Sequence, residues 1–153
     1  MYAGNGTKGA RMRFQCQESC GGRCCKGPEG FVFLTIDDIE RLEKALGRPR
    51  DTFAKIGVFD SVFFTDQKNV RAWYLNSAGK QCQFLVNGKC SVYPARPMQC
   101  RTYPFWPTLK DKKAWHAEKA KCPGIDKGPH RDDAQVLMVD QKRAERMIPL
   151  RDV

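Results

Sequence analysis

Eight cysteines in two groups constrain this chain more than any other feature of its sequence. The first group has the spacing Cys16-x3-Cys20-x3-Cys24-Cys25, and the second is Cys82-x7-Cys90-x9-Cys100, followed by Cys122. The N-terminus lacks the apolar segment of a secretory signal, so we expect a cytoplasmic protein, or one in an organelle matrix if a transit peptide was removed. Thiols stay reduced in such compartments, and four disulfides are therefore not expected. Clustered reduced thiols indicate metal or redox chemistry.

The cysteine count fits two kinds of metal centre. Four plus four thiolates match two tetrahedral zinc sites. They match equally well one four-iron cluster, [4Fe–4S], with further thiols beside it, because a cubane cluster also takes four thiolates. Adjacent Cys24 and Cys25 have diverging side chains, so we expect one of them to serve a second site, to bridge, or to stay free. The alternative without metal is a set of buried structural thiols.

The charge of the chain is strongly positive, with 27 Lys and Arg against 17 Asp and Glu and a net charge of +10. Residues 67–107 hold three of the cysteines and contain no carboxylate. Basic groups near a thiol lower its pKa and favour the thiolate, which is the form that binds metal. The same charge, with aromatic residues beside basic ones and a basic N-terminal arm, also fits a nucleic-acid or ribonucleoprotein-associated module.

The apolar pattern predicts a small, irregular α+β domain organised by metal, with few short strands. Apolar residues at helical spacing between Thr35 and Gly47 predict a helix over 36–46, with Thr35 as the N-cap. A second amphipathic helix is predicted near 133–147. One face of that second helix would carry Ala134, Leu137, Met138, Gln141 and Ala144.

The remaining elements are expected to be short. Strands are predicted at 31–34, 62–64 and 72–75, and a short helix at 51–56. Asn87-Gly88 predicts a tight turn. Four prolines within 93–107 exclude a long helix or a central strand there.

The domain organisation follows from these elements. We expect a mobile basic arm over 1–13, a cysteine-cluster domain over 14–125, and a C-terminal amphipathic helix extension over 126–153. No apolar run approaches the roughly 20 residues of a membrane-spanning helix, so no membrane partner is expected.

Several motifs stand together in this order: Phe14-x-Cys16-x3-Cys20-Gly21-Gly22-x-Cys24-Cys25, Gly30-Phe31-Val32-Phe33-Leu34-Thr35, Cys82-x-Phe84-Leu85, Cys90-x-Val92-Tyr93-x2-Arg96-Pro97-x2-Cys100-Arg101-x-Tyr103-Pro104-Phe105-Trp106 and Cys122-Pro123-Gly124. In this combination the chain resembles the YkgJ-type cysteine-cluster family, labelled CxxCxxCC and described as a zinc- or iron-chelating domain. The resemblance covers about residues 14–125, and all eight cysteines fall on the family's cysteine positions. It implies metal binding and says little about a substrate.

Two arginines lie beside the cysteines of the second group. Arg96 and Arg101 can donate hydrogen bonds to thiolate sulfurs or to nearby carbonyls, as residues around a metal site do. The aromatic residues of the same loop either cover the site or fill the core. They are Tyr93, Tyr103, Phe105 and Trp106.

No catalytic motif is present, and neither histidine belongs to a metal-binding pattern, so the sequence assigns no enzyme class. The first hypothesis is a metal-binding protein that holds zinc or an iron–sulfur cluster through the eight cysteines. The second is an iron–sulfur redox or electron-transfer component, which would favour an oxidoreductase-type role. The third is the basic nucleic-acid module.

Overall fold

The computed structural model describes residues 12–17, 20, 22, 31–64, 69–76 and 81–152. Short strands and helices alternate along the chain and confirm the expected α+β class. In chain order they are β1 (Arg13–Phe14), β2 (Phe31–Phe33), α2 (Ile36–Leu46), η3 (Arg50–Ile56), β3 (Val58–Phe64), β4 (Asn69–Asn76), β5 (Leu85–Val86), β6 (Lys89–Cys90), η4 (Tyr93–Ala95), α3 (Met98–Thr102), η5 (Pro107–Leu109), α4 (Lys112–Ala117), η6 (Glu118–Ala120), β7 (Ile125–His130), α5 (Ala134–Arg146) and β8 (Arg151–Asp152), where η marks a 3-10 helix.

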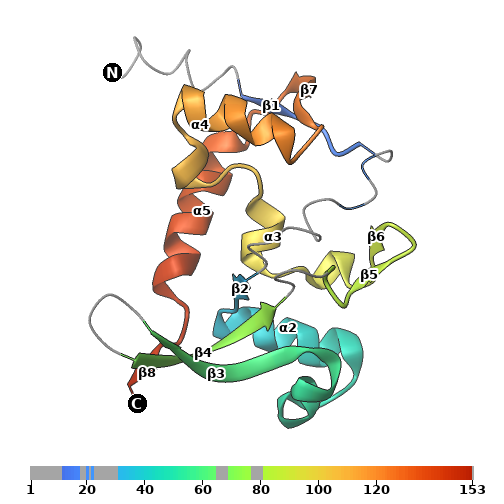
Figure 1. Ribbon diagram of the computed structural model, residues 1–153, viewed down its shortest axis with the longest axis vertical. Helices are drawn as coiled ribbons and strands as arrows, with labels where there is room; N and C mark the ends of the chain where they lie inside the picture. The colour runs from blue at the N-terminus through green and yellow to red at the C-terminus, as the bar shows by residue number, and fades with distance from the viewer. Residues whose placement is uncertain are drawn as a thin grey trace.

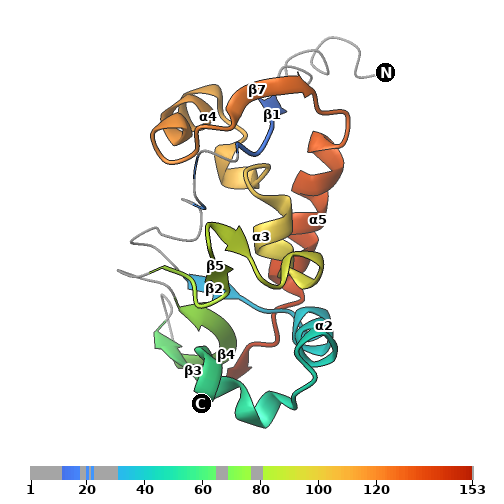
Figure 2. The ribbon, with the colours of Figure 1, turned by 90° about the vertical axis from the view of Figure 1, so that its right-hand side faces the viewer.

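The molecule is elongated, and α5 runs between its two ends (Figures 1 and 2). One end carries β1, β7 and α4, and the other carries α2, η3 and the hairpin of β3 and β4. The short helix α3 lies between them, and the hairpin of β5 and β6 lies to one side. The helix that carries Cys100 is therefore in the middle of the molecule.

The largest sheet is antiparallel and built around β4. One edge of β4 pairs with β3 along its whole length, from Val58 opposite Leu75 to Phe64 opposite Asn69. The other edge pairs first with β8 and then with β2, where Val32 lies opposite Leu75. The predicted strands at 62–64 and 72–75 are parts of β3 and β4, which are longer than the sequence indicated.

Helix α2 has the bounds that the sequence predicts. The Thr35 hydroxyl accepts from the backbone N–H of Asp38 at 3.0 Å, and the Asp38 carboxylate accepts from the N–H of Thr35 at 2.9 Å. This reciprocal pair satisfies two backbone donors that have no partner inside the helix. Gly47 ends the helix at φ 62°, a left-handed conformation that glycine adopts without steric cost.

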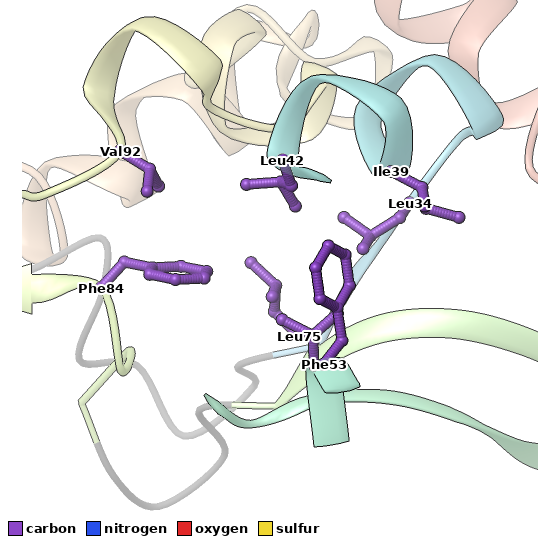
Figure 3. Packing of buried hydrophobic residues seen from close by; sticks show 8 residues of the cluster. Leu34, Ile39, Leu42, Phe53, Leu75, Phe84 and Val92 are labelled. Carbon is purple, nitrogen blue, oxygen red and sulfur yellow. The ribbon is translucent and has the colours of Figure 1, made fainter. Parts of the chain in front are cut away.

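A first hydrophobic core lies between α2 and the β3–β4 sheet (Figure 3). Leu34, Ile39 and Leu42 of the α2 region are fully buried against Phe53 and Leu75. Phe84 and Val92 extend this core toward the cysteine-bearing loop, and Cys82 and Cys90 pack against it. The core thus reaches the second group of cysteines directly.

A second hydrophobic core lies at the other end of the molecule. It joins β1, α4, β7 and α5 through seven buried residues, which are Met12, Phe105, Trp115, Cys122, Ile125, Ala134 and Met138. Helix α5 buries the face that the sequence predicts, with Leu137 partly buried at its margin. The same helix also packs against α3, and its Gln141 is only 6% exposed at this contact.

The elements that the sequence did not predict include β1, α3, α4, β7 and β8. Strand β7 pairs with β1, with Phe14 opposite Ile125, and this contact joins distant parts of the chain. Met12 is buried and Arg13 begins β1, whereas residues 1–11 of the expected arm lie outside the described residues. The division into three domains stays a prediction.

Replacing Leu42 by alanine should destabilise the protein by about 2–5 kcal/mol, because Leu42 is fully buried and the change leaves a cavity in the first core. The control is Val136→Ala on α5, where the side chain is 58% exposed and an effect of about 0.5 kcal/mol or less is expected. Urea unfolding measures both. Equal effects would contradict the assignment of this core.

The carboxylate of Asp126 should make stability depend on acid pH. Hydrogen bonds from Lys119 and from the Trp115 indole, which donates at 3.0 Å, hold the pKa of Asp126 below its usual value. A group whose pKa is lower in the folded state stabilises above its unfolded pKa, and this stabilisation is lost as the pH falls. Asp126→Asn keeps a residue that tolerates the φ of 63° at this position. The variant should therefore lose less stability than the parent between neutral and acid pH, as urea titrations at each pH would show.

Candidate metal centre

Six of the eight cysteines lie in the described residues, and they are distributed along most of the chain. Cys16 follows β1 and is exposed, whereas Cys122 precedes β7 and belongs to the second core. Cys20, Cys82, Cys90 and Cys100 are partly buried; Cys90 ends β6 and Cys100 is in α3. Cys24 and Cys25 lie outside the described residues.

Cys16 and Cys122 flank one backbone contact. The N–H of Gln15 donates to the carbonyl of Gly124 at 3.1 Å. A Cβ added at Gly124 would lie 2.5 Å from the Gln15 carbonyl oxygen, so the approach requires glycine. The segment that carries the first cysteine is thereby held against the segment that carries the last one, although more than a hundred residues separate them.

Cys20 lies close to the hairpin that carries Cys90. The Cys20 sulfur accepts from the N–H of Gly22 at 3.4 Å. A Cβ added at Gly22 would lie 2.6 Å from the Leu85 side chain, and Leu85 is opposite Cys90 in the β5–β6 pair. Leu85 also donates its N–H to the carbonyl of Cys82 at 3.0 Å. The first group of cysteines therefore approaches the second group at this hairpin as well.

The hairpin itself depends on a tight turn. Asn87 has φ 51° and Gly88 has φ 76°, and two consecutive positive values are what a two-residue hairpin turn of the Asn-Gly kind needs. The sequence prediction of a turn at this position is confirmed.

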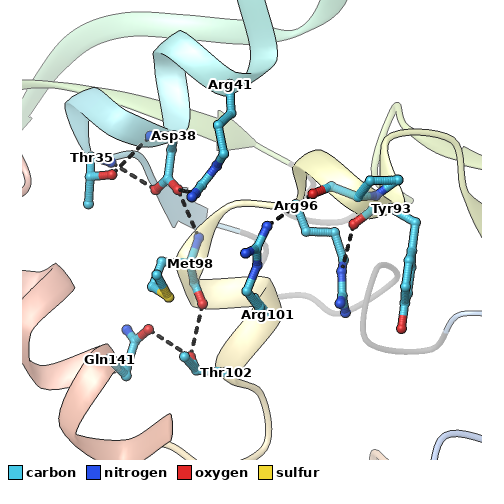
Figure 4. A network of polar contacts seen from close by, with 10 residues as sticks. Thr35, Asp38, Arg41, Tyr93, Arg96, Met98, Arg101, Thr102 and Gln141 are labelled. Carbon is cyan, nitrogen blue, oxygen red and sulfur yellow. Dashed lines mark hydrogen bonds and ion pairs between the residues drawn. The ribbon is translucent and has the colours of Figure 1, made fainter. Parts of the chain in front are cut away.

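Helix α3, which carries Cys100, is held by hydrogen bonds on three sides (Figure 4). Its first N–H, from Met98, donates to the carboxylate of Asp38 in α2 at 3.0 Å. The amide of Gln99 accepts from Phe33 N–H at 3.2 Å and donates to the Phe31 carbonyl at 3.1 Å, as a neighbouring strand would. The Thr102 hydroxyl donates to Gln141 of α5 at 2.8 Å. Cys100 thus sits on a short but well-connected helix.

Three guanidinium groups gather beside this helix. Arg41 forms an ion pair with Asp38, and Arg101 donates to the carbonyl of Pro94 at 3.0 Å. Arg96 donates to the Tyr93 carbonyl at 3.0 Å and lies over the Tyr93 ring at 3.7 Å from its centroid. Partial burial lowers the pKa of Arg101, as do the charges of Arg41 and Arg96, while Asp38 opposes the shift.

In the structure the two loop arginines, Arg96 and Arg101, donate hydrogen bonds to backbone carbonyls. Their donation to a sulfur stays a prediction. Arg41 was not expected from the sequence, because it lies on a helix far from the cysteines along the chain. Its position beside Arg101 depends on the contact of α2 with α3.

The aromatic residues of the loop divide between core and surface. Phe105 is 1% exposed in the second core, and Tyr103 packs against that core. Trp106 is partly buried and donates its indole N–H to the carbonyl of Gln99 at 3.0 Å. Tyr93 is exposed beneath Arg96. Most of these aromatic side chains therefore pack inward and support the loop, and Tyr93 is the exception.

The donor set fits a metal that prefers sulfur. Two of the six described cysteines, Cys16 and Cys20, follow β1, and the other four belong to segment 82–122, while both histidines are exposed. Thiolates bind zinc and iron–sulfur clusters. Among the described residues, no three Cys, His, Asp or Glu side chains are placed together as a ready set of ligands.

Residues 15–123 match the model of the CxxCxxCC family, described as a "Putative zinc- or iron-chelating domain". The match covers most of the chain, which therefore belongs to this family, and it includes all eight cysteines. The expected family is confirmed, and the family description supports metal binding. No solved structure matches the chain significantly.

Within the described residues, no helix has both the length and the apolar character needed to cross a membrane.

Replacing Asp38 by asparagine should destabilise the protein by about 2–4 kcal/mol, because the buried carboxylate accepts from Thr35 and Met98 and pairs with Arg41. The control is Asp37→Asn in the same first turn, where the side chain is exposed and about 0.5 kcal/mol is expected. Chemical unfolding compares the two variants. A loss as small in Asp38→Asn as in the control would refute the role of this carboxylate in joining α2 to α3.

Proposed function

We propose that the protein binds zinc or an iron–sulfur cluster through cysteine thiolates drawn from both ends of its chain. The observation that carries this proposal is the approach of the two cysteine groups at two separate contacts, Gln15 with Gly124 and Gly22 with Leu85. Gly124 is required at the first contact, because a Cβ there would lie 2.5 Å from the backbone oxygen of Gln15, and Gly22 has φ 77°, a conformation that favours glycine. Glycines at these positions let the cysteine-bearing segments come close together.

The ligands we propose are all eight cysteines, with Cys24 and Cys25 serving different positions of the centre or centres. When bound, the metal supplies strong bonds to thiolates, and its binding free energy becomes folding free energy. The protein's own part is to hold the thiolates near one another and to provide positive charge beside them. Arg96 and Arg101 contribute that charge, and Arg41 adds a third guanidinium.

A structural or storage role is the function that this arrangement supports best. Both hydrophobic cores include or contact cysteines, so a metal bound there would connect the two ends of an elongated molecule. The N-terminal segment has little other secondary structure in the described residues, where only β1 belongs to it. A reducing compartment such as the cytoplasm would keep the thiols available.

An iron–sulfur centre would instead favour electron transfer, and the partial burial of four of the cysteines fits a centre that is neither sealed nor fully open. If iron is present, we expect a [4Fe–4S] cluster, a brown protein and absorbance near about 400 nm. A colourless zinc protein with no reducible centre would end the redox alternative.

Purification without oxygen, followed by metal analysis, tests the proposal. The protein should contain zinc or iron in a fixed ratio to the chain. Cys16→Ser and Cys90→Ser, one from each group, should both lower the metal content, because each removes a thiolate ligand. His116→Ala should leave it unchanged, since this histidine is exposed. A protein that folds and contains neither metal would contradict the proposal.

A further inference from the structure

A cluster of lysines covers the end of the molecule that carries α4 and β7. The surface, here called the lysine face, extends over residues 107–128 and holds six lysines against three carboxylates. All six are exposed, and they are Lys110, Lys112, Lys113, Lys119, Lys121 and Lys127. We propose that the lysine face binds the phosphate backbone of nucleic acid.

The three carboxylates of the lysine face are already engaged within the protein. Asp111 caps α4 by accepting from Ala114 N–H at 3.1 Å. Glu118 accepts from the Tyr103 hydroxyl at 2.6 Å. Asp126 accepts from the Trp115 indole and pairs with Lys119 at 2.6 Å. Of the six lysines only Lys119 has an ion pair among the described residues, so most of the positive charge faces solvent.

The charge is distributed unevenly along the molecule. Residues 36–64, which form α2, η3 and β3, contain five basic and six acidic residues. Figures 1 and 2 show these elements at the end opposite to α4 and β7. A molecule with one basic end and one nearly neutral end approaches a polyanion with the basic end first. The lysine face carries a net charge of +3, so its end of the molecule would meet such a partner first.

Two of the lysines lie where a positive charge does not help the protein to fold. Lys112 and Lys113 lie in the first turn of α4, which contains no acidic residue. The partial positive charge at a helix N-terminus disfavours cations there by a few tenths of a kcal/mol. Their removal should therefore not destabilise the fold, which separates a binding role from a structural one.

The basic residues of segment 67–107 are used differently. Arg71, Arg96 and Arg101 each donate to a backbone carbonyl of the protein. The sequence pointed to that segment for nucleic-acid binding because aromatic residues stand beside basic ones there. The structure favours the lysine face, where the side chains have no such partner among the described residues.

The lysine face fits nucleic acid better than a lipid surface. Helix α4 buries its large apolar residue, Trp115, and none of the exposed large apolar side chains in the described chain lies between residues 94 and 135. Peripheral membrane helices insert apolar residues in addition to their basic ones. Lysines without apolar neighbours suit phosphates in water and bind them without sequence preference. Arg13 in β1 lies at the same end but donates to the carbonyl of Gly128 at 3.1 Å, and Lys8 and Arg11 precede it in the sequence.

Fluorescence anisotropy with the purified, metal-loaded full chain tests the proposal. The probes are a mixed-sequence RNA strand and a DNA duplex, each about 20 units long, titrated at several salt concentrations. We expect binding that weakens steeply with salt, because each phosphate contact releases counterions. The triple variant Lys112→Gln, Lys113→Gln and Lys121→Gln should bind about tenfold more weakly, and its salt slope should fall by about 2–3.

The matched control is Lys44→Gln, Lys55→Gln and Lys89→Gln, which removes the same charge from exposed lysines elsewhere. It should weaken binding less than about threefold, and both variants should retain the parent melting temperature and metal content. Equal weakening by the two triples would show a general effect of net charge and overturn the proposal. It would also be overturned if anionic vesicles bound the protein as tightly as, or more tightly than, the nucleic-acid probes. Loss of metal binding in the cysteine variants would leave this result untouched.

Discussion

The buried carboxylate of Asp38 is the interaction on which the middle of the molecule depends. It accepts from the start of α2, from the first N–H of α3 and from Arg41, while its side chain is 1% exposed. A buried charge is tolerated only when it is paired and hydrogen-bonded, and this one is satisfied from two helices at once. The carboxylate that caps α2 therefore also fixes the orientation of α3 and hence of Cys100. One acidic residue places a cysteine that lies far from it along the chain.

Cysteines lie against both of the separate hydrophobic cores. The first core covers the α2 end and the second core covers the α4 end, and no residue belongs to both. Cys82 and Cys90 pack against the first core, whereas Cys122 is part of the second. A chain of this size divided between two small cores buries limited apolar surface in each, and metal binding is an effective way to join them. Metal and core would then stabilise the same structure.

The positive charge of the protein has two distinct surroundings. The guanidinium groups of Arg41, Arg96 and Arg101 lie together beside α3, in contact with backbone carbonyls and one carboxylate. The lysines of the lysine face extend into solvent at one end of the molecule. Arginine suits the first setting because its planar group donates in several fixed directions, and lysine suits the second as a mobile point charge. The net charge of +10 alone does not distinguish the arginines beside α3 from the lysines in solvent.

Local chemistry determined the helices. Thr35, Asp38 and Gly47 specify the start and end of α2, and the apolar face of α5 follows from spacing alone, because capping and periodicity act within a few residues. The turn at Asn87-Gly88 was likewise predicted from two neighbouring residues, and the family was recognised from short sequence motifs. The sequence by itself also indicated metal binding, through the number and grouping of its cysteines.

The tertiary structure decided which segments meet. The pairing of β1 with β7 and the approach of Gly22 to the 85–90 hairpin join residues far apart in the chain, and two-residue strands carry no pattern from which a partner can be predicted. The place of Arg41 beside Arg101 depends on the same long-range packing. The sequence therefore determined what the site is made of, and the folded chain determined where its parts come together.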